Sequence, residues 1–518
     1  MNFAQAIEHL YALGPELTAV PGVPRRNFDL AHMRTLCAAL GDPQTHVPSI
    51  LIAGTNGKGS TAATLASILV SAGYRTALYT SPHLVHVTER IQTAHPVLPS
   101  EYGSFTSHGA DGPLALQPIS EEDFAALYTR VDEACETLLA SHALPLSPSF
   151  FERLTAVAFL SFAGFGSTPP AEIMVLEVGL GGRLDATNVV EPLLSVITDI
   201  ALDHQEYLGN TITEIAGEKC GILRQNGVLI TLPQHPEANQ AIGIAATSRN
   251  VRAINASAYL PPAQRNQFDA RTLPEVNAYP ASSPLPRNRY TLTLDSHPEG
   301  EDATLEVDSP LPGQHQQRNL ALAIAAACEL RNQNSHLPNQ SSNQNGYNIT
   351  NAAVEAGIRN TQWPGRLEFL PPNLLLDVAH NPAGTWTLRS AIASLPQQRP
   401  RTLIFSCLRD KSLEEMSRIL FPLFDSSADG DPLRRRDHIL LAPIASPRAT
   451  PVEDLLAAAH ALGIPAHAAP HVAGALEQAR QITPADGLII ATGSVYLVGE
   501  LREQALHAMA HASAVAHT

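Results

Sequence analysis

An apolar segment that runs directly into a glycine-rich turn and then into a helical pattern constrains this chain more than any other feature. The segment Ser49–Ala53 is followed by Gly-Thr-Asn-Gly-Lys-Gly-Ser at 54–60, and apolar residues then recur on one side of a helix. Glycines let a backbone wrap closely around phosphate oxygens, and exposed N–H groups at a helix N-terminus favour negative charge. We therefore expect this loop to hold the phosphates of ATP.

The loop lysine, Lys58, is predicted to supply a cation to those phosphates. The loop is not a standard Walker A motif, because its lysine follows the first glycine too closely and Gly59 separates Lys58 from Ser60. A solvated lysine at a helix start is the alternative, but a cation there is unfavourable without an anion to meet. The predicted nucleotide contacts of the loop are Thr55, Asn56, Gly57, Lys58, Gly59 and Ser60.

Two series of short β-rich segments, each interleaved with helical patterns, predict two α/β domains with parallel sheets. A chain of 518 residues also exceeds the size of a single hydrophobic core. We place the domains at 1–309 and 310–518. The first series comprises 49–53, 76–80, 173–178, 194–200 and 228–231, and the second 374–379, 402–406, 438–441 and 487–492.

Between the two series lies a region rich in Pro, Asn, Ser and Arg, with strand-like pieces at 290–294 and 304–307. Three polar stretches, at 95–118, 260–287 and 332–348, are predicted to be surface insertions.

The composition excludes several classes of protein. Hydrophobic residues at 44% and charged residues at 16% indicate a folded chain, and no apolar run is long enough to span a membrane. A formal charge of −16 disfavours nucleic-acid binding. Five scattered cysteines without CxxC spacing argue against a disulfide framework and a zinc site. The N-terminus lacks a secretion signal, so we expect a cytoplasmic protein.

Three candidate magnesium ligands, Ser81, Glu177 and His204, follow predicted strands. Ligands in parallel sheets gather at the carboxyl ends of strands. Magnesium prefers oxygen, which suits a hydroxyl and a carboxylate, whereas an imidazole is a less usual ligand. The alternatives are a turn residue for Ser81 and a capping or solvent-facing histidine for His204.

Thr211 and Glu214 fit a capping box that starts a helix through Ile215, Lys219 and Ile222. This places Lys219 within a few turns of the candidate metal site. By pattern alone Lys219 is a solvated helical lysine.

Several long motifs occur in order along the chain, and together they resemble the folylpolyglutamate synthase family, including its bifunctional dihydrofolate synthase members. The resemblance covers about residues 54 to 500 and implies a relationship to the Mur ligases. It implies an α/β fold, in which a P-loop ATPase domain with a parallel-rich sheet precedes a smaller Rossmann-like domain, with the reaction at their cleft. The motifs are GTNGKGS, TSPHLVHVTER, SFFERLTAVAF, LEVGLGGRLDATNVV, ALDHQEYLGNTITEIAGEKCGILR, WPGRLE, DVAHNPAG and GSVYLVGE.

The resemblance implies that Ser81, Glu177 and His204 bind Mg²⁺, at one of two metal sites. Lys219 becomes a carbamylated lysine that helps to hold the second ion. Carbon dioxide adds only to a neutral amine, so the usual lysine pKa of about 10.4 must be lowered by burial or nearby cations.

The resemblance also assigns Asn319, Arg366 and Asp377 to ATP contacts. The alternatives for these residues are a helix cap, a turn cation and a strand-end acid. His380 and Ser494 are predicted contacts for glutamate or the leaving phosphate. The implied catalytic residues are Lys58, Lys219, Arg366 and His380, and the implied contacts of the pterin substrate are Ser149, Phe150, Phe151, Glu152, Leu184, Asp185 and Ala186.

The implied activity is ATP-dependent ligation of L-glutamate to dihydropteroate, to reduced folylpolyglutamate or to both, through an acyl phosphate. We expect a monomer whose partners are small-molecule substrates, with no nucleic-acid or membrane partner. A Mur-type peptidoglycan ligase is the nearest rival, but it would place an additional domain before the loop, and the 53 residues that precede Gly54 are barely at the lower size limit of a domain. A nucleotide-gated binding protein would need the loop but neither Arg366 nor a carbamate.

Overall fold

The computed structural model describes residues 1–14, 29–96, 114–262, 283–294, 303–332, 347–427 and 430–516. Two compact units share the chain. Unit 1 comprises 1–260, 292–307 and 318–361, and unit 2 comprises 261–291, 308–317 and 362–518. The predicted boundary after residue 309 therefore lies within a short unit 2 segment, after which the chain returns to unit 1 at Arg318.

Unit 1 is built on an eight-stranded sheet in the order β4-β3-β2-β5-β1-β6-β7-β8. The six strands from β2 to β8 run parallel, while β3 pairs antiparallel with both of its neighbours. The strands are β1 (Ser49–Ala53), β2 (Thr76–Tyr79), β3 (Ile91–Pro96), β4 (Leu114–Pro118), β5 (Ile173–Glu177), β6 (Leu194–Ile197), β7 (Val228–Thr231) and β8 (Arg252–Asn255).

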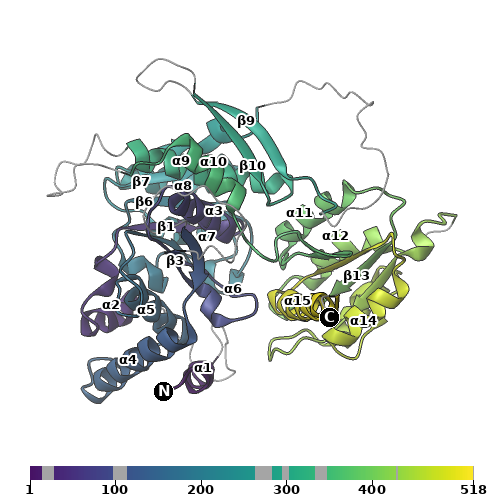
Figure 1. Cartoon of the computed structure of the whole chain (residues 1–518), viewed down its shortest axis with the longest axis horizontal. Helices are drawn as coiled ribbons and strands as arrows, with labels where there is room; N and C mark the ends of the chain where they lie inside the picture. The colour runs from purple at the N-terminus through teal and green to yellow at the C-terminus, as the bar shows by residue number, and fades with distance from the viewer. Residues whose placement is uncertain are drawn as a thin grey trace. The chain divides into compact units, whose positions relative to one another are not determined.

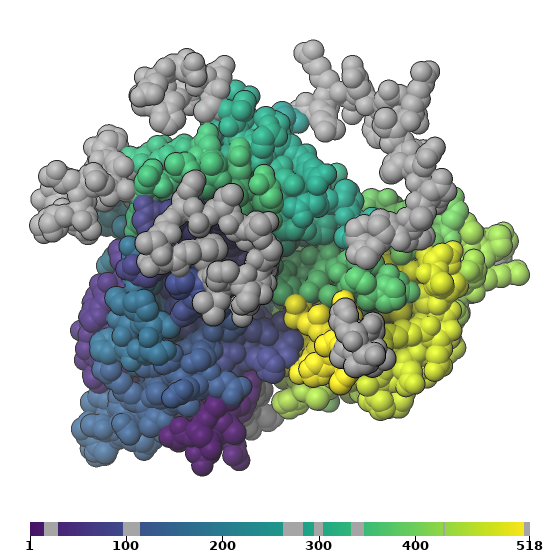
Figure 2. Space-filling view, viewed as in Figure 1, coloured from purple at the N-terminus to yellow at the C-terminus, as the bar shows by residue number. Residues whose placement is uncertain are grey.

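Helices cover both faces of this sheet (Figure 1). One face packs in a single apolar cluster with α1 (Phe3–Ala12), α2 (Leu30–Ala39), α4 (Glu121–Ala140), α5 (Phe150–Phe162), α7 (Ile212–Lys219) and α8 (Pro236–Ser248). On the other face α3 (Lys58–Ser71) contacts β1, β2 and β5. The outer side of α4 is exposed and can be followed in blue in Figure 2.

Helix α3 is apolar on nearly all sides because it lies between the sheet and α10 (Asn351–Asn360). The two helices approach closely at Gly357, where an added Cβ would lie 2.3 Å from the Cα of Ile68. Unit 1 also contains the short α6 (Gln205–Leu208) and most of α9 (Gln314–Asn332). This close packing fixes the helix whose first turn follows the glycine loop.

Unit 2 contains a six-stranded sheet in the order β11-β12-β16-β13-β14-β15, in which only β11 is antiparallel to its neighbour. The strands are β11 (Glu368–Leu370), β12 (Leu374–Leu376), β13 (Arg401–Phe405), β14 (His438–Leu441), β15 (His467–Ala468) and β16 (Leu488–Thr492). The helices are α11 (Pro382–Ala393), α12 (Leu413–Leu420), α13 (Val452–Ala461), α14 (Val472–Ile482) and α15 (Val495–Ala516).

A separate two-stranded sheet joins β9 (Asn288–Leu294) to β10 (Ala303–Ser309), as the strand-like pieces in this region predicted. The polar stretch at 95–118 is not wholly an insertion, because its two ends pair as β3 and β4. Residues 97–113, 263–282 and 333–346, which make up most of the three predicted insertions, lie outside the described residues.

All five cysteines are buried and free, as expected for packed thiols. In the part of the chain that the structure describes, we find no helix with the length and apolar character needed to cross a membrane.

Candidate active site

The candidate site of unit 1 lies at the carboxyl ends of four adjacent parallel strands, β2, β5, β1 and β6. The glycine loop follows β1, Ser81 follows β2, Glu177 ends β5, and the segment that leads to His204 follows β6. The register pairs Ile52 with Glu177 and Ala53 with Ile197. The topology therefore brings the predicted loop and the predicted metal ligands to one edge of the sheet.

The loop conformation depends on glycine at 57, the N-cap of α3. Gly57 has a φ of +90°, and an added Cβ would lie 2.2 Å from the Oδ1 atom of Asn319. Asn319 is 6% exposed and lies inside α9, so it is not a helix cap. The side chain predicted to contact ATP is thus packed against the loop predicted to hold its phosphates.

The loop amides divide into two groups. The N–H groups of Thr55 and Asn56 both donate to the carbonyl oxygen of Asp199, at 2.8 and 3.1 Å. The N–H groups of the first turn of α3 have no acceptor within the helix, as at any helix start. The amides from Lys58 onward, which begin the helix, are therefore the predicted anion-binding groups of the backbone.

Two lysines lie at the loop. The Lys58 Nζ atom donates to the carbonyl oxygens of Gly54 and Thr55 at 3.1 and 3.2 Å. The Nζ atom of Lys219, the last residue of α7, also donates to Gly54, at 2.7 Å. Lys219 is only 4% exposed, so the sequence pattern that favoured a solvated lysine was wrong.

Burial, and after it the positive charge of Lys58, lower the pKa of Lys219 from 10.5 to about 7, against the opposing attraction of Asp203 and Asp185. A substantial neutral fraction of this amine is therefore present near neutral pH. The capping box of Thr211 and Glu214 that starts α7 is present as predicted. Helix α7 ends at Lys219, and a 3₁₀ turn carries the chain on through Ile222.

Two of the three predicted magnesium ligands, Ser81 and Glu177, lie at the ends of the adjacent strands β2 and β5. The Ser81 N–H donates to the Oε2 atom of Glu177 at 3.1 Å, and Glu177 is 5% exposed. His204, the residue before α6, has a left-handed backbone conformation, and its side chain makes no capping bond to the helix. Its Nε2 atom lies 3.9 Å from the Oδ2 atom of Asp203.

Asp203 was not predicted as a site residue. The sequence signal was its position directly before His204, but only the structure reveals its influence on Lys219. Among the described residues, no three His, Cys, Asp or Glu side chains gather closely enough to form a metal site by themselves. A metal here would need the Ser81 hydroxyl, water or phosphate oxygens as further ligands.

The segments predicted to contact the pterin substrate begin helical turns. Ser149 caps α5, where its hydroxyl accepts the Glu152 N–H at 3.2 Å and donates to the Glu152 carboxylate at 2.6 Å. Asp185 is buried and accepts N–H groups of Leu180 and Thr187, and burial raises its pKa. Both acids are thereby held in fixed orientations.

In unit 2, Asp377 follows β12 and is 8% exposed. Its carboxylate accepts the N–H groups of Leu367 and Ala379, each at 2.9 Å. Burial raises its pKa, while the Arg366 guanidinium acts in the opposite direction. The Arg366 guanidinium carbon lies 6.0 Å from the centre of the Trp363 ring.

His380 and Ser494 follow the adjacent strands β12 and β16. The Nδ1 atom of His380 bonds to the carbonyl oxygen of Val378 at 2.8 Å, which leaves Nε2 as its second polar atom. Ser494 is 1% exposed and its hydroxyl accepts the Tyr496 N–H at 3.2 Å. The carboxyl ends of these strands thus gather the four polar residues predicted for this unit: Arg366, Asp377, His380 and Ser494.

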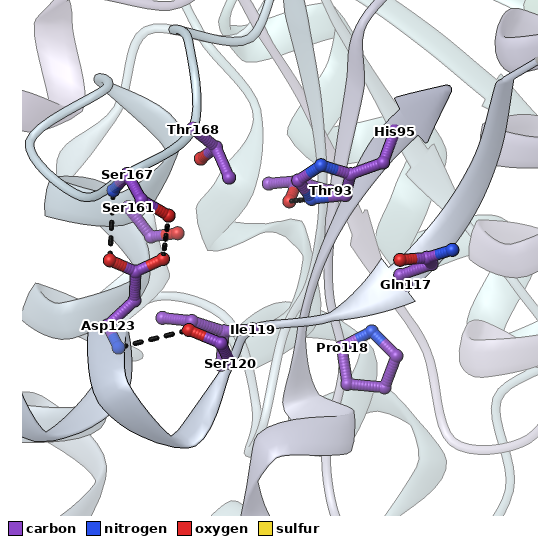
Figure 3. A pocket seen from close by; sticks show the side chains of 10 residues that line it. All are labelled: Thr93, His95, Gln117, Pro118, Ile119, Ser120, Asp123, Ser161, Ser167 and Thr168. Atoms are coloured by element: carbon purple, nitrogen blue, oxygen red, sulfur yellow. Dashed lines mark hydrogen bonds between the residues drawn. The ribbon is translucent and has the colours of Figure 1, made fainter. Parts of the chain in front are cut away.

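A separate pocket of about 140 Å³ in unit 1 is lined by none of the predicted site residues (Figure 3). Its main polar groups pair with one another. The Asp123 carboxylate accepts the Ser167 hydroxyl and N–H, and the Thr93 hydroxyl bonds to His95 (Figure 3). We do not assign the pocket to the reaction.

The fold and the phosphate loop define an α/β protein of the Mur ligase class. The family model for the Mur ligase middle domain matches residues 166–327. The dihydrofolate synthase/folylpolyglutamate synthase of Bacillus subtilis is 34% identical over 394 residues, which make up 76% of this chain and 78% of the relative. The Mycobacterium tuberculosis protein with the same name is 30% identical over 441 residues, 83% of this chain and 77% of that relative.

Comparison with solved structures gives the same family as the comparison of sequences. Folylpolyglutamate synthase of Mycobacterium tuberculosis, complexed with ADP and AMPPCP, matches with a TM-score of 0.71 and 26% identity, over 97% of this chain and 99% of that one. The Escherichia coli FolC protein in complex with DHPP and ADP matches with a TM-score of 0.70 and 25% identity, over 97% of each chain. The chain belongs to the folylpolyglutamate synthase family, and it is an ATP-dependent, ADP-forming ligase of folate metabolism.

Proposed function

We propose that this protein joins L-glutamate to the carboxylate of dihydropteroate, of reduced folylpolyglutamates, or of both. The observation that carries the proposal is the meeting of the glycine loop, Lys58, Lys219 and Glu177 at one edge of the sheet. The names of the relatives supply the acceptor class, because they include both dihydrofolate synthase and folylpolyglutamate synthase.

A carboxylate does not react with an amine unaided, so the reaction has two steps. A carboxylate oxygen of the pterin substrate attacks the γ-phosphorus of ATP, and ADP leaves. The amino group of glutamate then attacks the acyl carbon of the resulting acyl phosphate, loses a proton, and displaces inorganic phosphate. Both partners of the first step are anions, so neutralising their charge lowers the barrier.

Several residues of unit 1 are suited to neutralise this negative charge. The first-turn amides of α3 and the Lys58 ammonium hold the phosphates, with Asn319 beside the loop at Gly57. The Glu177 carboxylate and the Ser81 hydroxyl suit Mg²⁺, because both offer oxygen at adjacent strand ends, with His204 as a third ligand. Mg²⁺ bound there would neutralise phosphate charge.

The environment of Lys219 favours formation of a carbamate on its amine. Its buried amine has a pKa near 7, so a neutral nitrogen is available to attack carbon dioxide without a strong base. Addition of carbon dioxide to the neutral amine forms an N–C bond and releases one proton, so a neutral buried group becomes an anion with two oxygens. Such an anion provides ligands for a second Mg²⁺.

In unit 2 we assign Arg366 and Asp377 to ATP, and His380 and Ser494 to glutamate or the leaving phosphate. Asp377 orients the segment that carries Arg366 by accepting the Leu367 N–H. In unit 1 we assign the pterin substrate to 149–152 and 184–186. Free buried thiols are consistent with a reducing compartment, and we propose a cytoplasmic monomer.

The test is a product assay with the full chain, ATP, Mg²⁺ and L-glutamate. Dihydropteroate and tetrahydrofolate are supplied in separate reactions, and phosphate release is compared with the product mass. We expect a product heavier by one glutamyl residue with at least one acceptor, and none with Lys58→Met. Phosphate release without a glutamylated product would refute the proposal and favour a nucleotide-gated binding protein.

A further inference from the structure

We infer that the ion pair between Asp199 and Arg318 is a positioning device that sets the phosphate loop for ATP. The pair lies within unit 1 and joins the segment after β6 to α9. Neither residue is a predicted contact of ATP, metal or substrate. The inference rests on the proposal that the glycine loop holds the nucleotide.

The loop side of this device is the backbone of Asp199. Its carbonyl oxygen accepts the N–H groups of both Thr55 and Asn56, and Asn56 and Asp199 form an antiparallel bridge. The Thr55 hydroxyl adds two bonds to Ala201, donating to its oxygen and accepting its N–H, each at 3.1 Å. The position of Asp199 therefore dictates the path of the chain just before Gly57.

The helix side is the guanidinium of Arg318. Its Nε atom donates to Asp199 Oδ2 at 2.8 Å and its Nη2 atom donates to Oδ1 at 2.5 Å, a two-pronged geometry that fixes the carboxylate in direction as well as distance. Nη2 also donates to the Pro233 carbonyl at 3.0 Å, which anchors the arginine to the segment after β7.

Asn319, the residue after Arg318, connects the ion pair to the proposed ATP site. Asn319 packs against Gly57, so one turn of α9 touches the loop directly through Asn319 and holds it indirectly through Arg318. Breaking the ion pair frees α9 and the loop to shift relative to one another. The Asp199 and Arg318 side chains are 38% and 30% exposed, so solvent screens the pair and its loss leaves no deeply buried charge.

The experiment measures ATP binding by the full chain with Asp199→Asn, Arg318→Lys and both changes together. Asp199→Asn keeps hydrogen-bonding ability but removes the negative charge, and Arg318→Lys keeps the positive charge but removes the two-pronged guanidinium geometry. For either variant we expect the Kd for ATP to rise about fivefold to tenfold. The double variant should lose little more than either single variant, because the two residues act as one unit. The KM values for glutamate and the pterin acid should stay unchanged.

A matched control is Glu172→Gln. Glu172 pairs with Arg75 at the opposite, amino-terminal edge of the same sheet, with comparable exposure, and we expect it to leave ATP affinity unaltered. A purely structural role would lower the melting temperature of the Asp199 and Arg318 variants while their Kd for ATP remained normal, and that result would overturn the inference. Absence of ATP binding by the unaltered protein would refute both the inference and the proposed role of the loop.

Discussion

Lys58 and Lys219 both donate to the carbonyl oxygen of Gly54, at 3.1 and 2.7 Å, although they belong to different helices. Two ammonium groups on one oxygen repel each other, and the deeper of the two, Lys219, bears the larger cost because it has lost its water. The arrangement therefore favours a neutral Lys219 beside a charged Lys58. Loss of a proton, or reaction of the free amine with carbon dioxide, relieves the conflict.

Replacing Lys219 with Ala should reduce turnover by about 10²-fold while ATP affinity stays close to normal, because the proposed carbamate would serve metal geometry and not nucleotide binding. Steady-state kinetics and ATP titration measure the two quantities. Lys219→Arg is the matched variant, since it keeps a cation that cannot form a carbamate, and it should be equally impaired. Full activity in Lys219→Arg, or in protein depleted of carbon dioxide, would exclude the carbamate.

The depressed pKa of Lys219 also predicts how stability depends on pH. The unfolded chain binds a proton at about 10.5 and the folded chain only at about 7, so stability falls as pH drops between these values and is constant below them. Lys219→Met removes this dependence. In buffer free of carbon dioxide, the variant should melt several degrees above the unaltered protein at pH 7 and close to it at pH 10.5. Parallel melting curves at all pH values would contradict the buried neutral amine.

Sequence predicted those parts of the site that depend on local chain properties. The apolar run at Ser49–Ala53, the following glycines and the capping box at Thr211 each specify a short segment by themselves, and each is observed as predicted. The resemblance added the residue roles, which remain proposals.

Long-range contacts were not predictable. A helical pattern says which side of α7 is apolar but not that its last residue, Lys219, reaches Gly54, more than a hundred residues away in sequence. The stretch at 95–118 was predicted to be an insertion, but its ends belong to β3 and β4, which pair with each other while β3 also pairs with β2. Asp199 looked like the end of a strand, and its partner Arg318 is identified only by the fold.

Arg366→Ala should slow formation of the acyl phosphate by about 10²-fold, the loss typical when one electrostatic stabiliser is removed. Single-turnover measurement of γ-phosphate transfer isolates this step from product release. Arg418→Ala is a suitable control in the same unit, because the Arg418 side chain is 65% exposed and pairs with Glu414 of its own helix. Transfer at a normal rate in Arg366→Ala would remove this residue from the chemistry.

Arg153→Ala should destabilise unit 1 by about 3–5 kcal/mol, the cost typical of removing one partner of a largely buried ion pair. Arg153 is 1% exposed, pairs with Asp132, and donates to the Ser147 hydroxyl at 3.0 Å. Urea unfolding measures the loss, and Arg153→Lys should recover part of it by keeping the charge near Asp132. A loss below about 1 kcal/mol would mean that the pair behaves like an exposed one.

Gly57→Ala should weaken ATP binding more than it weakens the fold. The φ of +90° at this position costs an L-residue about 1–2 kcal/mol, and the new methyl group would overlap the Oδ1 atom of Asn319. Relief of both strains requires the loop to move away from α9, which displaces the amides proposed to bind phosphate. Gly217→Ala is the matched control, because Gly217 lies in α7 with no atom within 4 Å of an added Cβ, and alanine there should be neutral or slightly stabilising. ATP titration of the two variants measures the loss of binding, and thermal melting measures the loss of stability. Equal ATP affinities of the two variants would show that the loop tolerates a side chain at position 57. They would also show that the contact between Gly57 and Asn319 does not set the nucleotide site.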